Sequence, residues 1–518
     1  MVGEHLQHLR GKSNSVWDGW YYSSMQVDVR SLFVCLSLAV WGYACGKGTD
    51  DPTIDPRAAT CSDGIQNGDE TSMDCGGACG GRTIPGILNI TNDTDLDSLA
   101  DVCGVQGSLF IFGTDLTTVE LPQLLTVGER IKIEQNVSMS AIGLPKLEVV
   151  GNDMEISNNA ALLEIVLPAL NTQNYGIAIK NNAELTRITF AELSTIGANI
   201  DIESNPHLTT LMLDELGVIG EGLKISDNAA LTSVTFPKLS LVGGDMTIEN
   251  NAALITVTLD QVSMVGEDLS ISQNNQLTTV TLSELSTVAS LFITYNKILT
   301  TVTLSELRTV PYLSIEDNDQ LPTLDLPKIS MGGAIYIESN KALTTLTLPV
   351  LSEVISMTIE YNDELTTLTL PMLRQVGVGG LSISGTALTT LTLDKLSQVD
   401  GGLSIGSNDE LTALTLDKLS QLGGDLDIRE NAALTTIALP ALTEVGRSLA
   451  IVSNGALTTL TLELLRKVGI TLGIVSNAGL DTISLPALTE VGDGMYIQNN
   501  ANGLSCTGPY FAANTCSH

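Results

Sequence analysis

The stretch AALTSVTFPKLSLVGGDMTIENN, residues 229–251, is one unit of a pattern that recurs from about residue 105 to residue 505. The general form of the unit is N-x-A-L-T-T-L-T-L-P-x-L-x-x-V-G-G-x-L-x-I-x-x-N. Asn closes sixteen units, and Thr114 and Thr386 fill the same place in two more. Successive closing residues are 22 or 23 positions apart, except for 24 before Thr386. Eighteen units of nearly constant length predict a solenoid.

Each unit contains two short runs in which apolar and polar residues alternate. One is LTTLTL, for example Leu343 to Leu348, and the other is LxI, for example Leu403 to Ile405. Alternation with β-branched residues predicts strands, and a further apolar pair between the two runs lies on a turn-like segment. No stretch of ten residues in the repeats has helical periodicity. The sequence therefore predicts an all-β stack in which aliphatic side chains of successive turns form one core.

Two further features of the unit predict how each turn closes. The Val242-Gly243-Gly244 segment and its variant Leu422-Gly423-Gly424 are expected to form a tight corner with unusual φ angles. The recurring Asn is expected to point inward and bond the backbone of the neighbouring turn, which would satisfy buried N–H and C=O groups. We therefore predict a structural asparagine ladder, rather than a row of ligands, that begins with Asn136, Asn159, Asn182, Asn205, Asn228, Asn251 and Asn274.

The repeat resembles the receptor L-domain repeat of the insulin and epidermal-growth-factor receptor ectodomains. It is more similar still to tandem forms in fungal cell-wall glycoproteins and bacterial surface proteins. The resemblance covers about four-fifths of the chain and implies a right-handed, parallel β-helix-like solenoid related to leucine-rich repeats. It also implies ligand binding through a sheet face and its neighbouring loops, although this array is much longer than one L domain.

Composition limits the classes of partner. The chain has 518 residues, 43% hydrophobic but only 4% aromatic, so the core must consist of Leu, Ile and Val. There are 24 Lys and Arg against 59 Asp and Glu, which gives a net charge of −35. A surface this acidic repels phosphate backbones and excludes nucleic-acid binding, but favours metal cations and cationic partners.

The start of the chain has the pattern of an export signal. Residues 31–44, SLFVCLSLAVWGYA, form a short apolar run that follows Arg30. Because the 24 residues before Met25 do not resemble the start of a signal, Met25 is a candidate for the true start. The run ends in Ala44-Cys45 and resembles a bacterial lipobox, which implies a lipid anchor at Cys45, although Gly42 and Tyr43 depart from that pattern. The alternatives are an outer-membrane or cell-surface lipoprotein and a soluble secreted protein.

The cysteines outside this signal lie only at the two ends of the mature chain. An exported chain favours disulfides, and six cysteines allow three of them. Cys506 and Cys516 are expected to staple a C-terminal cap, whereas the N-terminal four allow three pairings. A zinc site around Cys75 and Cys79 is the less favoured alternative. The disulfide candidates are Cys61, Cys75, Cys79, Cys103, Cys506 and Cys516.

The segment CSDGIQNGDETSMDCGGAC, residues 61–79, resembles a short cysteine-rich module found behind the export signal of many bacterial surface proteins. It interleaves oxygen donors with glycines, which suits Ca²⁺, although the spacing matches no EF-hand. The alternative is a solvated linker, and no other cofactor is expected. The candidate calcium ligands are Asp63, Asn67, Asp69, Glu70 and Asp74.

Side chains that flank the Ile of the LxI run form the predicted binding face. This is an acidic stripe with interspersed tyrosines, which suits a basic protein surface, a calcium-bridged partner or a sugar. The alternative is a merely solvated strand face. The residues of this face are Asp201, Glu203, Glu249, Glu316, Glu338, Glu360, Tyr336 and Tyr361.

These features predict a non-catalytic binding or adhesion protein of the cell surface whose partner is a protein or a glycan. The alternatives are a structural envelope or spacer protein and a carbohydrate-active β-helix enzyme. The enzyme is disfavoured because constant unit length leaves no room for a long loop and only His207 lies in the array. The predicted layout is a targeting segment at 1–45, an acidic linker at 46–60, a cysteine-rich module and cap at 61–104, the solenoid at 105–505 and a disulfide cap at 506–518.

Overall fold

A computed structural model of the chain describes residues 66, 75, 77 and 80–513. The chain divides into two compact units, Met1–Asp55 and Pro56–His518, and the first lies wholly outside the described residues. The predicted export signal, the lipid anchor at Cys45 and the acidic linker therefore remain predictions. The same holds for Cys61, Cys79, Cys516 and the candidate calcium ligands Asp63, Asn67, Asp69, Glu70 and Asp74, which also lie outside the described residues.

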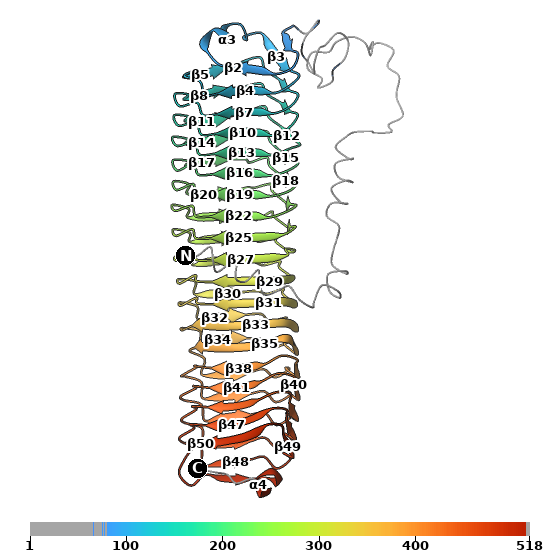
Figure 1. Ribbon diagram of the computed structural model, residues 1–518, viewed down its shortest axis with the longest axis vertical. Coiled ribbons are helices and arrows are strands. Elements are labelled where there is room, and N and C mark those ends of the chain that lie inside the picture. Colours follow the sequence, from blue (N-terminus) through green and yellow to red (C-terminus); the bar gives the residue numbers. More distant parts are fainter. Residues whose placement is uncertain (1–65, 67–74, 76, 78–79, 514–518) are drawn as a thin grey trace, which may run out of the picture. The chain divides into compact units, whose positions relative to one another are not determined.

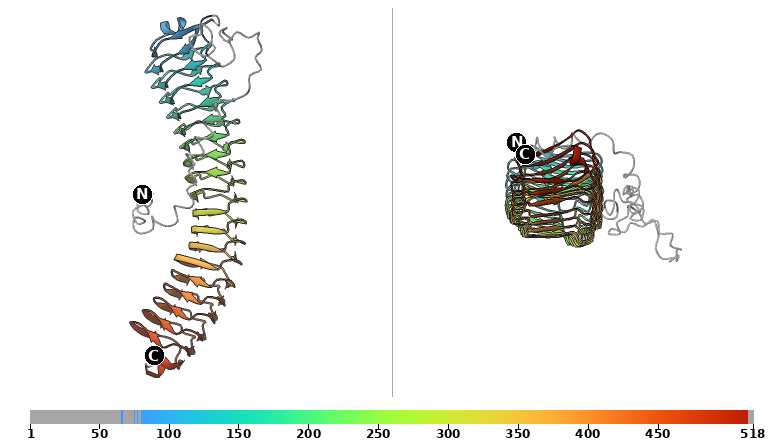
Figure 2. Two further views of the ribbon diagram at one scale, coloured as in Figure 1. Left: turned by 90° about the vertical axis from the view of Figure 1, so that its right-hand side faces the viewer. Right: turned by 90° about the horizontal axis from the view of Figure 1, so that it is seen from below.

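The second unit is a parallel β-solenoid whose coils follow one another in chain order (Figure 1). Seen along the stack, the coils superpose on one another (Figure 2). Among the described residues the only α-helices have five residues each, α3 (Asp93–Asp97) near the start of the stack and α4 (Pro509–Ala513) at its end. None of the described helices is long and apolar enough to cross a membrane. The predicted all-β parallel solenoid is confirmed.

Most coils place strands on three faces. The LxI runs form the main sheet, in which every strand pairs in parallel with its counterpart in the next coil. Its strands are β2 (Leu88–Ile90), β4 (Leu109–Phe112), β7 (Ile131–Glu134), β10 (Met154–Ser157), β13 (Ile177–Lys180), β16 (Ile200–Glu203), β19 (Leu223–Ser226), β22 (Met246–Glu249), β25 (Asp268–Ser272), β27 (Ser290–Thr294), β29 (Thr309–Glu316), β31 (Met331–Glu338), β33 (Glu353–Asn362), β35 (Gln375–Thr386), β38 (Leu403–Gly406), β41 (Leu426–Arg429), β44 (Leu449–Val452), β47 (Thr471–Val475) and β50 (Gly494–Gln498).

The second face carries short strands that precede the main-sheet strand in most coils. They are β1 (Arg82–Ile84), β3 (Val102–Val105), β6 (Thr126–Val127), β9 (Val149–Val150), β12 (Thr172–Gln173), β15 (Thr195–Ile196), β18 (Val218–Ile219), β21 (Leu241–Val242), β24 (Met264–Val265), β37 (Gln398–Val399), β40 (Gln421–Leu422), β43 (Glu444–Val445), β46 (Lys467–Val468) and β49 (Glu490–Val491).

The third face is built from the LTL runs and is split into five small sheets. Its strands are β5 (Thr118–Glu120), β8 (Ala141–Gly143), β11 (Glu164–Val166), β14 (Arg187–Thr189), β17 (Thr210–Met212), β20 (Ser233–Thr235), β23 (Thr256–Thr258), β26 (Thr279–Thr281), β28 (Thr301–Thr303), β30 (Thr323–Asp325), β32 (Thr345–Thr347), β34 (Thr367–Thr369), β36 (Thr390–Thr392), β39 (Ala413–Thr415), β42 (Thr436–Ala438), β45 (Thr459–Thr461), β48 (Thr482–Ser484) and β51 (Ser505–Thr507).

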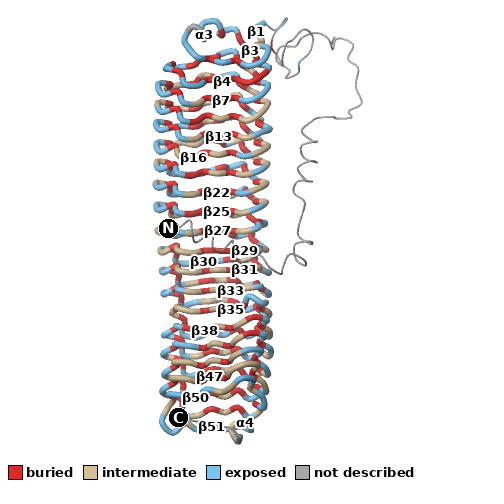
Figure 3. The backbone as a smooth tube through the Cα atoms, viewed as in Figure 1, coloured by how far each residue is buried: buried red, intermediate tan, exposed pale blue. Residues whose placement is uncertain are grey.

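The core is one continuous set of aliphatic rows. In β22, Met246 and Ile248 are buried, while the alternating residues Thr247 and Glu249 are half-buried on the outer side. Ile202, Ile225 and Ile248 are register partners in successive coils, so identical side chains stack along the solenoid. Figure 3 shows the buried positions repeating from coil to coil. This burial removes apolar surface from water over the whole length of the stack, and it is the main force that stabilises the fold.

The stack begins earlier than the repeat pattern indicates. Strands β1 and β2 pair with β3 and β4, so a coil is already in place at Arg82 rather than at residue 105. A disulfide joins Cys75 to Cys103, one of the three pairings that the sequence left open. Cys506, at the other end, is also disulfide-bonded. A disulfide cysteine therefore lies at each end of the described stack.

Near the middle of the stack the strand of the second face and the strand of the main sheet join into one strand. In 23-residue coils three residues separate Val242 from Met246, and the chain turns a corner between β21 and β22. In the coil that ends at Asn318 only Pro311 and Tyr312 separate Val310 from Leu313, and the corner straightens into the single strand β29. The same occurs in β31 and β33, so the middle of the solenoid has a wider outer sheet than its two ends.

The prediction that the corner glycines adopt unusual φ angles is wrong. Gly243 and Gly423 are absent from the described glycines with positive φ. A Cβ on Gly243 would lie 2.0 Å from the carbonyl oxygen of Gly220 in the preceding coil. Glycine is needed at these corners because successive backbones approach closely, not because of the local dihedral angle.

Asparagines run through the stack as a buried ladder. The side-chain nitrogen of Asn182 donates to the carbonyl of Ile156 at 3.0 Å and to Oδ1 of Asn205 at 3.2 Å. The backbone N–H of Asn182 donates to the same Oδ1 at 3.1 Å. Asn159 donates to Oδ1 of Asn182 in the same way, so each side chain links three coils. The seven predicted ladder residues, Asn136, Asn159, Asn182, Asn205, Asn228, Asn251 and Asn274, are all fully buried.

The residue before each ladder asparagine adopts the left-handed conformation, which the sequence did not reveal. Sixteen non-glycine residues have φ between 52° and 59°, and each immediately precedes an Asn of the ladder. Where Thr114 and Thr386 replace Asn, the preceding residues are Gly113 and Gly385. Left-handed backbone costs a non-glycine residue about 1–2 kcal/mol. We interpret the asparagine hydrogen bonds as what holds the other residues in this conformation.

Two columns of hydroxyl groups add to the ladder. The Thr344 hydroxyl donates to the carbonyl of Pro322 at 3.0 Å, one coil earlier. The Ser263 hydroxyl likewise donates to the carbonyl of Ser240 at 3.1 Å. These contacts repeat in many coils, which gives the Thr and Ser residues of the repeat a structural role.

Candidate functional site

The predicted binding-face residues all lie on strands of the main sheet. Asp201 and Glu203 are on β16, and Glu249 is on β22. The others are on three successive strands in the middle of the stack: Glu316 on β29, Tyr336 and Glu338 on β31, and Glu360 and Tyr361 on β33. The structure therefore divides the predicted stripe into two groups several coils apart, and the electrostatics of the groups differ.

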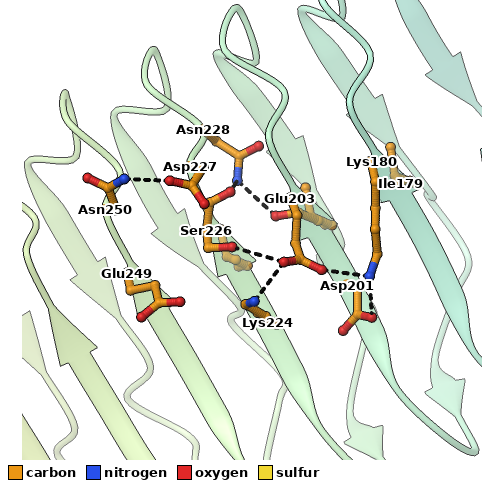
Figure 4. A network of polar contacts seen from close by, with 12 residues as sticks. Ile179, Lys180, Asp201, Glu203, Lys224, Ser226, Asp227, Asn228, Glu249 and Asn250 are labelled. Carbon is orange, nitrogen blue, oxygen red and sulfur yellow. Dashed lines mark hydrogen bonds and ion pairs between the residues drawn. The ribbon is translucent and has the colours of Figure 1, made fainter. Parts of the chain in front are cut away.

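Lysines pair with Asp201 and Glu203 of the first group, whereas Glu249 takes part in no ion pair between described residues. Lys180 Nζ lies 2.9 Å from Asp201 and 2.6 Å from Glu203, and Lys224 Nζ lies 2.7 Å from Glu203 (Figure 4). Burial by itself would raise the pKa of Glu203, but hydrogen bonds from Lys180 and Lys224 outweigh it and lower that pKa. Burial likewise opposes the hydrogen bonds that raise the pKa of Lys180. Carboxylates and ammonium groups here satisfy one another, so little charge is left for a partner.

The same pairing occurs nearer the start of the stack. Lys132 on β7 lies 2.8 Å from Glu134 and 3.3 Å from Glu155 on the next strand. A hydrogen bond to Glu134 is the largest cause that raises the pKa of this lysine. The sequence interpretation selected the acidic residues of the face and overlooked the lysines in the same columns. Alignment of the units would have revealed them, because coil register places them one strand apart.

The second group has no such compensation. Glu316, Glu338 and Glu360 are register partners in adjacent strands, and none takes part in an ion pair between described residues. Partial burial and the neighbouring charges of Glu316 and Glu360 raise the pKa of Glu338 to about 7. Burial also raises the pKa of Glu316, although the Ser314 hydroxyl donates to it. Burial and mutual repulsion therefore destabilise the negative charge of this column, and a bound cation would stabilise it.

An aromatic run lies beside this column. The ring centroids of Phe292 and Tyr312 are 5.2 Å apart, and those of Tyr312 and Tyr336 are 5.4 Å apart. All three rings are half-buried, and burial raises the pKa of Tyr312 to about 12. The sequence interpretation identified Tyr336 but not the other two. Tyr312 belongs to the sheet because it is one of only two residues between Val310 and Leu313, so the corner straightens and Tyr312 lies on the strand.

Exposed apolar side chains extend the surface on the side away from the glutamates. Ile355 on β33 is 47% exposed and Met331 at the start of β31 is 44% exposed. Pro311 is exposed on the neighbouring strand β29. The outer sheet of these coils thus has two lanes side by side. The acidic lane is the column of Glu316, Glu338 and Glu360, and the apolar lane consists of the three aromatic rings and Ile355. We call the surface formed by Phe292, Tyr312, Glu316, Tyr336, Glu338, Ile355 and Glu360 the central surface.

Lysines also neutralise the aspartates of the turn that borders the central surface. Lys297 lies 3.5 Å from Asp317 and 3.4 Å from Asp319, and its ammonium is 5.8 Å from the centre of the Tyr295 ring. Lys341 lies 3.1 Å from Asp319. Tyr361 at the other end of this turn column is 59% exposed. The lysines of these coils therefore pair with the turn aspartates and not with the glutamate column.

The described residues contain no group of three or more His, Cys, Asp or Glu side chains placed to hold a metal ion. His207, the one histidine in the described part, is exposed and lies 3.5 Å from Glu184. The predicted calcium site falls outside the described residues and stays a prediction.

No family model matches the chain, and no curated protein matches it. Among solved structures, a leucine-rich repeat protein from Bacteroides ovatus is 13% identical with a TM-score of 0.32, covering 64% of this chain and 83% of its own. A TLR13–ssRNA13 complex contains a chain that is 12% identical with a TM-score of 0.15, covering 77% of this chain and 80% of its own. At these values neither similarity assigns the chain to a family.

Proposed function

We propose that the chain is a non-catalytic binding scaffold that is exported to the cell surface and binds a protein or a glycan on the outer face of its main sheet. The observation that carries this proposal is the contrast along that face. The strands around β16 have internally paired charges, whereas β29, β31 and β33 carry unpaired glutamates beside aromatic and aliphatic side chains. A uniform spacer would need no such contrast.

The regularity of the coils supports the scaffold part of the proposal. Buried Leu, Ile and Asn are nearly constant from coil to coil, while the outward positions change. Solenoids of this kind build extended binding surfaces on an invariant core. The surface location rests on the apolar run at 31–44 and on Cys45, and both are features of the sequence.

The test is capture of ligands from cell-surface material by the purified full chain. The first variant replaces Glu316, Glu338 and Glu360 with Gln, and the matched control replaces Asp201 with Asn and Glu203 and Glu249 with Gln. At about pH 8, above the pKa of Glu338, both variants lose three negative charges from the same sheet. Circular dichroism checks that the control, which leaves Lys180 and Lys224 without these partners, is folded. We expect the first variant to lose captured material and the control to retain it.

Repeating the capture with and without calcium separates a direct contact from a calcium-bridged one. Equal capture by both variants would refute the central surface as the binding site. If neither wild type nor variants retain protein or glycan, the structural spacer is favoured instead. Turnover of acidic polysaccharides by the pure protein would favour the carbohydrate-active enzyme.

A further inference from the structure

We infer that the partner of the central surface is a protein segment in extended conformation that carries lysine or arginine side chains alternating with apolar ones. This inference rests on the proposed function and specifies its ligand. It is carried by the arrangement of two lanes on β29, β31 and β33, one acidic and one apolar, with no lysine or arginine of the described residues paired to the acidic lane.

The acidic lane sets the charge of the partner. Glu316, Glu338 and Glu360 stand in register on neighbouring strands, about 4.8 Å apart, which is the usual spacing between paired strands. Ser314 and Ser382 hydroxyls donate to the first and the last of these carboxyl groups. Hydroxyl donors orient carboxylates but do not neutralise them, so a row of cationic side chains complements this lane.

The chain provides an internal example of the contact that we expect. Lys297 lies near the Tyr295 ring and pairs with Asp317 and Asp319 on the turn that borders the central surface. The central surface repeats these elements, an aromatic ring beside carboxylates, but lacks the lysine. A cation of the partner placed between Tyr336 and Glu338 would gain both a carboxylate and an aromatic neighbour.

The aromatic run favours a protein segment over a sugar. A ring that stacks on a sugar needs one open face, whereas Phe292, Tyr312 and Tyr336 are half-buried and tilted from one another by 38° and 35°. Such rings offer edges and partial faces to aliphatic side chains. The exposed Ile355 continues the same lane and has no use in binding a polar sugar.

The acidic lane makes this contact dependent on pH. The groups that face Glu338 are Glu316 and Tyr312 from β29, Tyr336 on its own strand, Glu360 from β33, and Asp317 from the adjoining turn. Every one is acidic or neutral, so Glu338 loses its proton near neutral pH and the lane becomes more negative as the pH rises. Lysine and arginine of a partner keep their charge over this range.

The experiment measures binding of a fluorescent synthetic peptide, in which Lys alternates with Val, to the full chain by anisotropy. Two single variants have the same change in net charge: Glu338→Gln in the acidic lane and Glu203→Gln in the lysine-paired group. We expect Glu338→Gln to lower the affinity for the peptide about tenfold and Glu203→Gln to change that affinity less than about twofold. Wild-type affinity should rise from about pH 6 to about pH 8, and this rise should be lost in Glu338→Gln.

Tyr336→Phe keeps the ring and should bind the peptide with wild-type affinity, whereas Tyr336→Ser should lower that affinity. Circular dichroism checks that both variants are folded. Equal weakening by Glu338→Gln and Glu203→Gln would overturn the inference, since it would show attraction to net charge alone. Binding of neutral glycans, lost in Tyr336→Ser while the peptide does not bind, would assign a sugar instead. In that case the proposed binding scaffold stands and only the identity of its ligand fails.

Discussion

Thr386 donates to Oδ1 of Asn408 twice, from its backbone N–H at 3.1 Å and from its hydroxyl at 2.6 Å. It thus makes the forward contacts of a ladder asparagine. It has no amide to donate backward to the preceding coil, and there the backbone pairing of β33 and β35 continues to Asn362 and Thr386 instead. A side-chain ladder and a backbone ladder therefore substitute for each other at this step.

The ladder predicts that an asparagine in mid-stack contributes far more to the free energy of unfolding than Thr386 does. Asn251→Ala removes the acceptor of the Asn228 N–H and the donor to the Ile225 carbonyl, both buried. Each unsatisfied buried group costs about 1–3 kcal/mol, so the two groups together should cost about 2–6 kcal/mol. Thr386→Ala removes one hydroxyl bond and should cost about 1 kcal/mol. Native-state hydrogen exchange of the neighbouring amides measures both, and equal losses would refute the ladder's role.

The left-handed position before the ladder gives a second prediction. Gly385 has φ 61°, and a Cβ there would lie 3.2 Å from the backbone nitrogen of Tyr361. Gly385→Ala should therefore lower the free energy of unfolding by about 1–2 kcal/mol. Ser453→Gly, at an equivalent position with φ 56°, should leave stability unchanged or raise it by up to about 1 kcal/mol. Urea unfolding followed by circular dichroism distinguishes these outcomes, and a stabilising Gly385→Ala would contradict the account.

Close approach at the corners gives a third prediction. A Cβ on Gly266 would lie 2.0 Å from the carbonyl oxygen of Gly243, so Gly266→Ala should cost about 1–3 kcal/mol. Gly217 is the matched control, because its nearest neighbour is 3.7 Å away. Gly217→Ser would also supply a hydroxyl to the column in which Ser240 already donates to the Gly217 carbonyl. We expect it to be neutral or stabilising, and a comparable loss at both positions would contradict the steric explanation.

Stability should depend on pH with opposite signs at two glutamates. Because the pKa of Glu338 is raised from 4.5 to about 7, the native state holds a proton that the unfolded chain has lost between these values. Its contribution therefore falls as the pH rises to 7 and is constant above that. Glu338→Gln should raise the melting temperature relative to wild type at about pH 8, and this difference should shrink towards about pH 5.

Glu203, whose pKa is lowered by Lys180 and Lys224, should behave in the opposite way. Its stabilisation is complete above the unfolded pKa and is lost as the pH falls through the folded one. Glu203→Gln should therefore lower the melting temperature at neutral pH and match wild type in acid. If the melting temperature of Glu338→Gln equals that of wild type at every pH, the ionised Glu338 does not destabilise the central surface.

Most of the fold follows from spacing and alternation in the sequence. The period of 22 or 23 residues and the LxI and LTL runs determine the coils, because only one face of each strand can be buried. The role of the corner glycines was not predictable, since the 2.0 Å approach to the preceding coil is a property of stacked backbones. The left-handed residues were not predictable either, because their identities vary from Asn158 to Tyr295 and Glu430.

The candidate site was predictable in its location but not in its composition. The sequence pointed to the flanks of the LxI run, and Glu316, Glu338 and Glu360 do lie there. Whether a carboxylate is neutralised depends on which lysine the register places beside it, as Lys180 beside Glu203 shows. The aromatic run depended on the two-residue spacing between Val310 and Leu313, which makes a strand where other coils have a corner.

Carboxyl footprinting of the full chain, with and without material captured from the cell surface, tests the central claim most directly. Chemical modification of each glutamate is quantified by mass spectrometry, and the lysine-paired Glu203 serves as an internal reference. We predict that bound ligand lowers the modification of Glu316, Glu338 and Glu360 while that of Glu203 is unchanged. Unchanged modification of all three in the presence of bound ligand would contradict the account, because the ligand would then bind elsewhere on the solenoid.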